Sequence, residues 1–469
     1  MGRVAVSAPS AGTLLVFLGG TAALLTFFSP KTGLGILVFS MLLSPEIGLG
    51  RTGYRDVVIR YDDILVLVVF FSWLARSAIK KETAFFFSTP VNLPIFLYIT
   101  VCVLSTSLGI VSGRLHFAES FFYVLKYIEY FMLFLLAANI IENEKNIRAY
   151  LICGAITAAV VIAYGATQYF ILGGGFRVAL PFESPMGQKS WGEPATAGGY
   201  YLIVMAVLLG FYTQVKGRVS KLSIISFVLI APLFMLTLSR TSYLAFAAMT
   251  VSAIVMTGRK KIHLAAVILC MTIGIAVVSP VIKDTIQERV LFTFQTKERV
   301  RVTFHVGPGA EIKLESSAAA RVLAWQRIFF EKFPIHPLLG WGVPGVGIVD
   351  SQIPLVLGET GLLGLSLFLW MLLRIWKTGA GLYRNPGNDT DKALGFALCI
   401  LLIALFVQTL GVNTFIIVRV MEPFWLLAAI VARRYAASIP VVPADNPEKF
   451  KEEAGMLQGR RQKLFPAQP

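Results

Sequence analysis

Residues 321–364, RVLAWQRIFFEKFPIHPLLGWGVPGVGIVDSQIPLVLGETGLLG, join a polar segment to an apolar one. The first part is amphipathic and carries Arg321 and Trp325. A turn rich in proline and glycine follows, then the lone Asp350, and then a new apolar run. This stretch closes the one long polar interruption in an otherwise apolar sequence. We expect the chemistry here, because a mostly lipid-soluble chain has little other use for so much polar sequence on one side of a membrane.

The composition is that of a multi-pass membrane protein. Apolar residues make up 56% of the 469 residues, and the mean hydropathy of +0.73 exceeds that of soluble globular proteins. Apolar runs of about 18 residues recur along the chain, and each can cross the hydrocarbon core as a helix. The sequence therefore predicts an all-α fold with about twelve or thirteen transmembrane helices. The predicted spans are 11–28, 33–49, 61–77, 93–112, 119–139, 149–171, 197–213, 222–238, 241–257, 263–282, 353–374, 393–411 and 417–432.

Basic residues in alternate connections orient these spans. Clusters at 216–221 and 259–261 lie in short loops, and such loops are cytoplasmic. This orientation places the loops 172–196 and 283–352, and the turn at 239–240, on the outer face. We divide the chain into four parts: N-terminal transmembrane helices (1–282), a periplasmic loop (283–352), C-terminal transmembrane helices (353–433) and a flexible basic cytoplasmic tail (434–469).

The net charge of +16 does not indicate a nucleic-acid partner. Much of the positive charge lies beside the spans, where it meets the anionic headgroups of the lipid bilayer. The four cysteines (Cys102, Cys153, Cys270 and Cys399) all fall inside predicted spans and form no CxxC pair. The histidines lack the spacing of a metal site. The sequence therefore predicts no disulfide framework, no metal centre and no cofactor.

Two arginines are candidate anion-binding residues. Arg240 interrupts two apolar runs in LTLSRTSYLAF, where a guanidinium could hold a phosphate with two hydrogen bonds. The alternative is an arginine that extends from a helix end toward water. Arg321 could be a second phosphate clamp, or it could lie on the solvated face of an amphipathic helix, stacked on Trp325. Together, two fixed cations on one side of the membrane could neutralise a departing lipid pyrophosphate.

Carboxylates near the outer edge are candidate bases. Asp350 precedes an apolar span and could accept a proton from an acceptor hydroxyl; alternatively, Asp350 and Ser351 could simply cap a helix. Glu359 lies deeper within the same span, where an ionisable residue suggests function or helix pairing. Residues Arg177, Glu183, Lys189 and Glu193 of the other outer loop could contact substrate.

Local patterns predict the structure around these residues. The VTFHV and EIKL stretches flank GPGA and predict a small hairpin. A helix capped by Ser316 or Ser317 should then run to about Phe333 and stop at Pro334. Elsewhere, Lys126 with Glu129, and Arg419 with Glu422, have a three-residue spacing that we interpret as simple pairing along a helix.

These motifs resemble the region shared by the O-antigen ligase and O-antigen polymerase family of bacterial membrane glycosyltransferases. The matching elements are Arg321 and Trp325, HPLLGWG at 336–342, Asp350-Ser351, ETGLLG at 359–364, and Ser239-Arg240 before an apolar span. They lie within 222–433, and the rest of the chain is similar only in hydropathy.

The resemblance implies a metal-independent, inverting glycosyltransferase of the bacterial inner membrane, active on the periplasmic or outer face. Its donor would be a glycan on undecaprenyl pyrophosphate. Its acceptor would be a lipid-A core sugar, another lipid-linked glycan or a protein hydroxyl. Arg240 and Arg321 would bind the pyrophosphate and Asp350 would activate the acceptor, with Glu359, Trp325 and Arg177 in support. Ligases of this family typically have histidine where this chain has Asp350, which favours a polymerase or an exopolysaccharide relative.

Two other classes remain as alternatives. A flippase or transporter of polyisoprenoid-linked glycans would need a central charged cavity and internal pseudo-symmetry, whereas this chain concentrates polar groups at the outer edge. A non-catalytic scaffold for polysaccharide synthesis would tolerate substitution of Arg240, Arg321 and Asp350.

Overall fold

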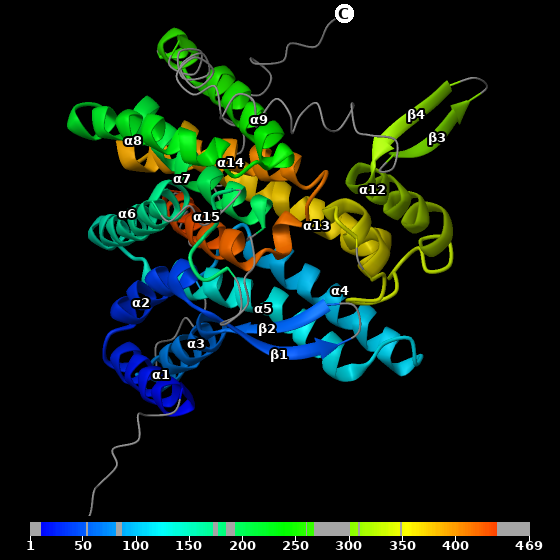
Figure 1. Ribbon diagram of the computed structural model, residues 1–469. Coiled ribbons are helices and arrows are strands. Elements are labelled where there is room, and N and C mark those ends of the chain that lie inside the picture. Colours follow the sequence, from blue (N-terminus) through cyan, green and yellow to red (C-terminus); the bar gives the residue numbers. More distant parts are fainter. Residues whose placement is uncertain are drawn as a thin grey trace, which may run out of the picture.

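The protein forms a bundle of helices with two small β-hairpins (Figure 1). The computed structural model describes residues 11–52, 55–80, 87–171, 177–183, 193–258, 260–266, 301–307, 310–347 and 349–438. The predicted span 263–282 beyond 266, Cys270, Lys189 and the tail beyond 438 lie outside these residues.

Most of the described chain is helical. The helices are α1 (Ala11–Phe28), α2 (Pro30–Leu43), α3 (Tyr61–Ile79), α4 (Asn92–Val111), α5 (Phe117–Ile140), α6 (Glu144–Ala166), α7 (Pro194–Gln214), α8 (Arg218–Met235), α9 (Arg240–Met256), α12 (Ser316–Gln326), α13 (Gln352–Arg384), α14 (Asp389–Gln408) and α15 (Val418–Ser438). Short π or 3-10 turns are η1 (Thr167–Ile171), η3 (Arg327–Lys332) and η4 (Thr414–Ile416). The strands are β1 (Glu46–Thr52) paired with β2 (Arg55–Arg60), and β3 (Arg301–Gly307) paired with β4 (Ala310–Glu315).

The all-α, multi-pass fold class is confirmed. Among the described residues, seven helices are long and apolar enough to cross a membrane: α4, α5, α6 with η1, α7, α8, α13 and α14. The shorter helices α2 and α9 and the second half of α1 are also apolar. α3 and α15 lie in the same bundle and carry buried ionisable side chains.

The predicted span 33–49 is wrong at its C-terminal end. α2 stops at Leu43, and β1 occupies the remainder. The reason is Pro45, which disfavours helical geometry in the preceding residue, and Ser44 is indeed extended with φ −87° and ψ 127°.

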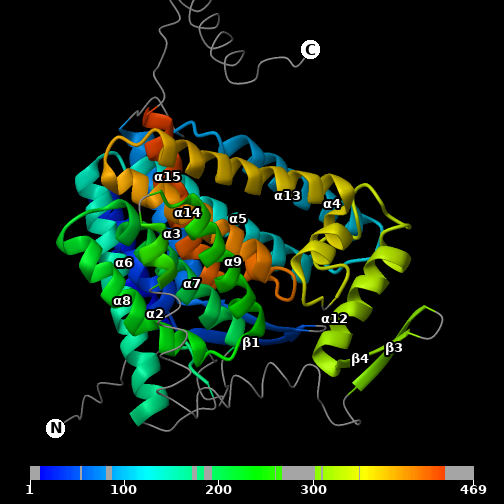
Figure 2. The ribbon, with the colours of Figure 1, turned by 90° about the horizontal axis from the view of Figure 1, so that it is seen from above.

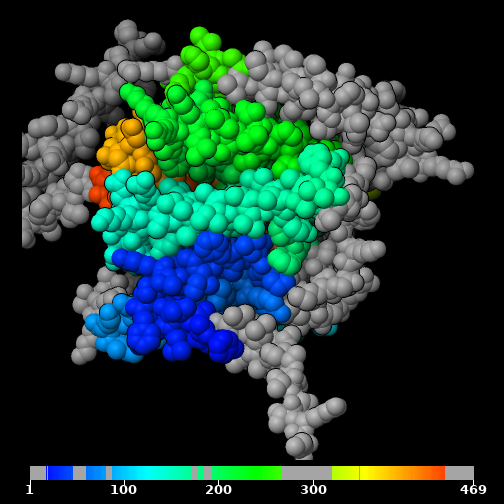
Figure 3. Space-filling view, turned by 60° about the vertical axis from the view of Figure 1, so that its left-hand side comes forward, coloured from blue at the N-terminus to red at the C-terminus, as the bar shows by residue number. Residues whose placement is uncertain are grey.

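α14 lies at the centre of the bundle, where it packs against α7, α9 and α13 (Figure 2). α15 packs against α5, and its Trp425 meets the ring of Phe131 edge-on with 5.0 Å between centroids. On another face, α6 lies between the N-terminal helices and α8 (Figure 3). At the predicted cytoplasmic end, Arg434 of α15 binds Asp391 of α14 through two hydrogen bonds of 2.7 and 2.6 Å. The opposite ends of these helices position the residues discussed below.

Candidate functional site

The predicted hairpin and helix before the Pro/Gly-rich turn are confirmed. β3 and β4 pair antiparallel, with Phe304 opposite Ile312. α12 begins at Ser316, and η3 continues the helix to Lys332 before Pro334. The segment lies beside the start of α13 at the edge of the bundle (Figures 1 and 2).

Arg321 and Trp325 share one face of this segment, as their spacing predicts. Both line a groove of about 650 Å³. The other lining residues are Val322, Gln326, Phe329, Phe330, Phe333 and, from the turn after α14, Leu410. The Trp325 and Phe329 rings lie 5.6 Å apart at an interplanar angle of 33°. A guanidinium beside an aromatic groove suits a ligand that has an anionic head and an apolar tail.

The N-terminus of α9 is held by a buried hydrogen-bond network. Ser239 is the N-cap residue, and its hydroxyl accepts from Ser242 N at 3.3 Å and from Ser242 Oγ at 2.7 Å. Gln408 of α14 donates to Ser242 Oγ at 2.9 Å. A Cβ on Gly198 of α7 would lie 2.2 Å from that same oxygen, so the packing requires glycine. The half-buried Arg240 is the first residue of this fixed helix. A helix N-terminus favours anions, so an anion there would meet both the helix and the guanidinium.

Arg321 and the residue that follows Arg240 approach the same turn. Gly411 follows α14, and a Cβ on it would lie 2.6 Å from Thr241 Cγ2 and 3.5 Å from Arg321 Nε. Thr241 directly follows Arg240. The start of α9 and Arg321 of α12 therefore meet at Gly411, although the chain separates them by many residues.

Asp350 borders this same turn. Its side chain is exposed, and both neighbouring residues are fixed: Asn413 donates to Val349 O, and Ser351 Oγ donates to Leu410 O at 3.3 Å. Ser351, rather than Asp350, is the N-cap residue of α13. Of the Asp350-Ser351 pair that could cap the helix, Ser351 takes the N-cap position, without a side-chain capping bond, and Asp350 is an exposed carboxylate on a fixed backbone.

The HPLLGWG turn and the ETGLLG segment form one interlocked unit. α13 is broken at Gly361, where φ is +66°. The break leaves carbonyl and N–H groups of α13 without partners inside the helix. The HPLLGWG turn supplies the missing hydrogen-bond partners. The bonds are Trp341 N to Gly358 O (2.9 Å), Gly342 N to Glu359 O (2.8 Å), Leu362 N to Pro337 O (2.8 Å) and Leu363 N to Leu338 O (3.2 Å). The two motifs are thus complementary pieces of one backbone structure.

One known protein family matches a continuous segment that contains most of these elements. Residues 225–369 match a family model described as O-antigen ligase. This segment is similar to the O-antigen ligase family. The match includes most of α8, α9, α12, the HPLLGWG turn and the broken part of α13. It confirms the resemblance inferred from the motifs and supports a role in surface-polysaccharide biosynthesis. A search among curated proteins finds no significant match.

Glu359 lies within this ligase-family segment but not at its exposed edge. It is 4% exposed, and its carbonyl oxygen also accepts a hydrogen bond of 2.7 Å from Ser105 of α4. Its backbone therefore belongs to the frame that holds the HPLLGWG turn. A direct contact with substrate stays a prediction.

Arg177 lies near the α8–α9 turn of the ligase-family segment. The next residue, Val178, donates to Leu236 O at 3.0 Å, just before Ser239 and Arg240. Arg177 is half-buried there. The structure therefore places residues 177–178 beside the end of α8, shortly before Arg240. Glu193, also from the connection between α6 and α7, is the N-cap residue of α7.

Glu183 joins the two ends of the loop between Leu180 and α7. Its carboxylate accepts from Leu180 N at 3.0 Å and from Glu193 N at 2.7 Å. Burial raises the pKa of Glu183 to about 7, against the lowering effect of these N–H groups and of Arg419. The folded form therefore binds this proton more tightly than the unfolded form does.

We expect a pH-dependent stability from Glu183. Because its folded pKa is raised, its contribution to stability is present at low pH and is lost as pH rises toward about 7, by at most about 1.4 kcal/mol per pH unit. Thermal unfolding of wild type and Glu183→Gln between about pH 5 and 8 checks this, since glutamine does not titrate. Wild type should lose stability relative to the variant as pH rises. Parallel curves would contradict the assignment.

Sequence reasoning missed a cationic group around Trp341. Lys332 Nζ lies 4.1 Å and the Arg114 guanidinium 5.6 Å from the Trp341 ring centre, and His336 meets the ring edge-on at 4.7 Å. Burial and the nearby Arg114 lower the pKa of His336. Arg114 comes from the α4–α5 connection, and no local sequence signal relates it to Trp341.

Proposed function

We propose that the protein transfers or polymerises a glycan carried on undecaprenyl pyrophosphate, at the periplasmic face of the bacterial inner membrane. The observation that carries the proposal is the meeting of α9 and α12 at Gly411. Arg240 begins α9, Arg321 lies on α12, and Asp350 follows a loop fixed to the same turn.

The donor is proposed to bind by its pyrophosphate at Arg240 and Arg321. Guanidinium groups keep their charge at every physiological pH and can donate two parallel hydrogen bonds to phosphate oxygens. The N-terminus of α9 adds backbone N–H groups and a positive dipole end. The aromatic groove that begins at Arg321 suits the first isoprene units of the lipid.

The reaction is proposed to be a single displacement. An acceptor hydroxyl attacks the anomeric carbon, and the bond from that carbon to the pyrophosphate oxygen breaks. Asp350 takes the hydroxyl proton, and the leaving pyrophosphate keeps the bonding electrons. The negative charge that grows on the leaving oxygen is stabilised by the two guanidinium groups, which were in place before the reaction. One displacement inverts the anomeric configuration, and the two cations perform the charge stabilisation without a metal ion.

A polymerase is the form of this activity that we favour. Asp350 is an exposed carboxylate, whereas ligases of the family typically have histidine at the aligned position. The acceptor would then be a second lipid-linked glycan.

The experiment uses a host that lacks the native gene. Wild type and the variants Arg240→Ala, Arg321→Ala and Asp350→Asn are expressed to matched levels, and lipid-linked glycan and finished polymer are separated on gels. We expect each variant to lose long polymer and to accumulate single lipid-linked units. Polymer that forms but never reaches its final acceptor would identify a ligase instead.

Two matched controls test for general damage. Arg148→Ala removes an exposed arginine of α6, and Asp389→Asn alters an exposed aspartate at the start of α14. Both should give the wild-type pattern. If the three site variants also behave like wild type, the catalytic proposal is wrong, and a scaffold or a transporter becomes the better explanation.

A further inference from the structure

Ionisable side chains gather inside the bundle, away from the candidate site. They form what we call the carboxyl cluster, at the junction of α3, α5 and α15. Its members are Arg60, Asp62, Asp63, Lys126, Glu129 and Glu422. Asp62, Glu129 and Glu422 are 0%, 4% and 1% exposed. Buried charges are costly unless each has a partner, so every ionised group in such a cluster needs an opposite charge or a hydrogen-bond partner.

The cations of the carboxyl cluster are each shared between two carboxyl groups. Arg60 Nη2 contacts Asp62 and lies 3.7 Å from Glu422 Oε2. On the other side, Lys126 contacts Asp63 and lies 3.4 Å from Glu129. The Lys126–Glu129 pair predicted from the sequence is thus confirmed, but it is one part of a larger group.

Charge balance within the cluster is incomplete. Four carboxyl groups face two cations, so full ionisation would leave two negative charges without a matching cation. Within the part of the chain that the structure describes, neither oxygen of Glu422 accepts a hydrogen bond. A buried carboxylate without donors is strongly unfavourable.

Two side chains near Glu422, Arg419 and Tyr130, donate hydrogen bonds to backbone carbonyl oxygens and not to Glu422. Arg419, one turn before Glu422 on α15, donates to the carbonyl oxygens of Leu42 at 3.1 Å and Pro181 at 2.7 Å. It also lies near enough to Glu183 to lower the pKa of that carboxyl group, against the larger effect of burial. Tyr130 of α5 donates its hydroxyl hydrogen to Ile416 O at 3.0 Å. These hydrogen bonds do not supply the donor that Glu422 lacks.

We propose that the carboxyl cluster is a proton-binding site in which Asp62 and Glu422 share one proton. Both carboxyl groups border the same Arg60 nitrogen, and they are close enough to form a hydrogen bond when one of them carries a proton. A shared proton removes one surplus negative charge and provides the missing donor. A metal ion fits less well, because no group of three potential ligands among the described residues is suited to hold one.

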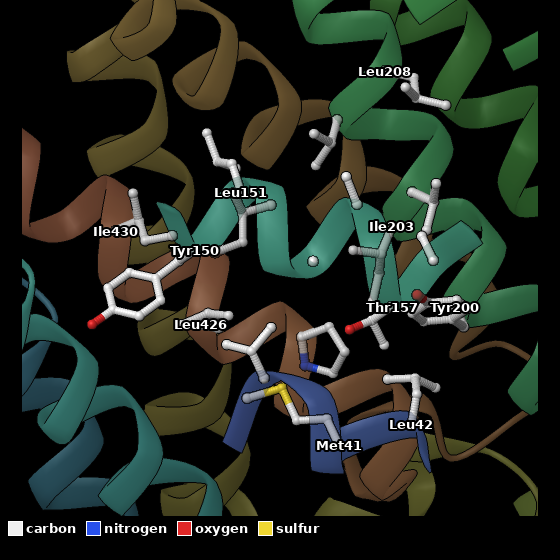
Figure 4. A pocket seen from close by; sticks show the side chains of 18 residues that line it. Met41, Leu42, Tyr150, Leu151, Thr157, Tyr200, Ile203, Leu208, Leu426 and Ile430 are labelled. Atoms are coloured by element: carbon white, nitrogen blue, oxygen red, sulfur yellow. The ribbon is translucent and has the colours of Figure 1, made fainter. Parts of the chain in front are cut away.

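The site is connected to the apolar pocket between α2, α6, α7 and α15 (Figure 4). Met41 lines this pocket, and its carbonyl accepts a 2.7 Å hydrogen bond from Arg60. Pro423, which also lines the pocket, directly follows Glu422. Loss of the proton would therefore act on two helices that form the pocket wall. Lys126, with its side chain 29% exposed, provides a route for proton exchange.

Infrared spectroscopy of the full-length protein in lipid nanodiscs tests the proposal directly. A protonated carboxyl group has a carbonyl stretching band that is distinct from that of a carboxylate and shifts in D₂O. We expect wild type to show this band at neutral pH. Glu422→Gln and Asp62→Asn should each lose that intensity, because each removes one of the two groups that share the proton. Asp391→Asn is the control, since Asp391 lies outside the cluster and accepts two hydrogen bonds from Arg434.

The outcomes separate the possibilities. All spectra are compared in a Glu183→Gln background, because Glu183 can itself carry a proton near neutral pH. A band that is absent from Glu183→Gln alone, or that persists when Glu422→Gln and Asp62→Asn are each added to it, would overturn the proposal, and the spectrum of Glu183→Gln alone decides even if neither cluster variant folds. The measurement is repeated with sodium replaced by choline. A protonated band that appears only without sodium would assign the site to a bound sodium ion, and the proton proposal would be rejected.

Discussion

Replacing Arg321 with alanine is expected to lower the rate of glycan transfer by about 100-fold or more, with little change in fold. Loss of one preorganised group that stabilises transition-state charge typically has an effect of this size. Arg321 is half-buried, lines the aromatic groove and lies next to Gly411, so its removal shortens one side chain at the edge of the groove.

Arg321→Lys should recover only part of the activity. Lysine keeps the charge but provides a point cation in place of a planar pair of donors. The measurement is transfer by purified protein with a polyprenyl-pyrophosphate oligosaccharide as donor. We expect kcat to fall more than the donor KM rises, because the charge develops on the leaving group. Arg148→Ala is the control. Activity of Arg321→Ala within a few-fold of wild type would exclude a role in charge stabilisation.

The sequence predicted those parts of the site that depend on interactions between residues close together in the chain. The β3–β4 hairpin was predictable from alternating residues around a Gly-Pro-Gly sequence, and the helix of α12 from the serines at its start and Pro334 after its end. The shared face of Arg321 and Trp325 required only helical spacing. These interactions join residues within a few positions of one another.

The convergence of the site could not be predicted in this way. Gly411, Thr241 and Arg321 lie on three separate elements, and glycine at 411 matters only because the other two approach it. Similarly, the sequence shows HPLLGWG and ETGLLG as two motifs, but not that the N–H groups of one bind the carbonyl groups freed by the other. The Arg60–Glu422 contact joins α15 to the residue before α3 and carries no sequence signal. Tertiary packing decides each of these features.

The broken helix gives the second large expected effect, in Gly361→Ala. At Gly361 φ is +66°, and an added Cβ would lie 2.3 Å from Leu338 O. With ψ at −166°, the backbone lies in a region that is almost confined to glycine, which costs about 1–3 kcal/mol in a residue with a side chain. The clash cannot be relieved by a rotamer change, because the obstructing atom belongs to the backbone of the HPLLGWG turn. The turn must therefore move away from α13, which also displaces the loop that leads to Asp350. We expect a clearly lower melting temperature and loss of most transferase activity.

Gly113→Ala separates the two contributions. Gly113 also has a positive φ, of +69°, but no atom lies within 4 Å of an added Cβ. It therefore reports the cost of a positive φ without a clash. Thermal unfolding and transfer activity of both variants, measured together, should show a small loss for Gly113→Ala and a much larger one for Gly361→Ala. Equal, small losses would mean that the turn tolerates displacement from α13. The interlocked backbone would then not be what holds Asp350 in place, and its position would depend on the Ser351 and Asn413 contacts with the turn after α14.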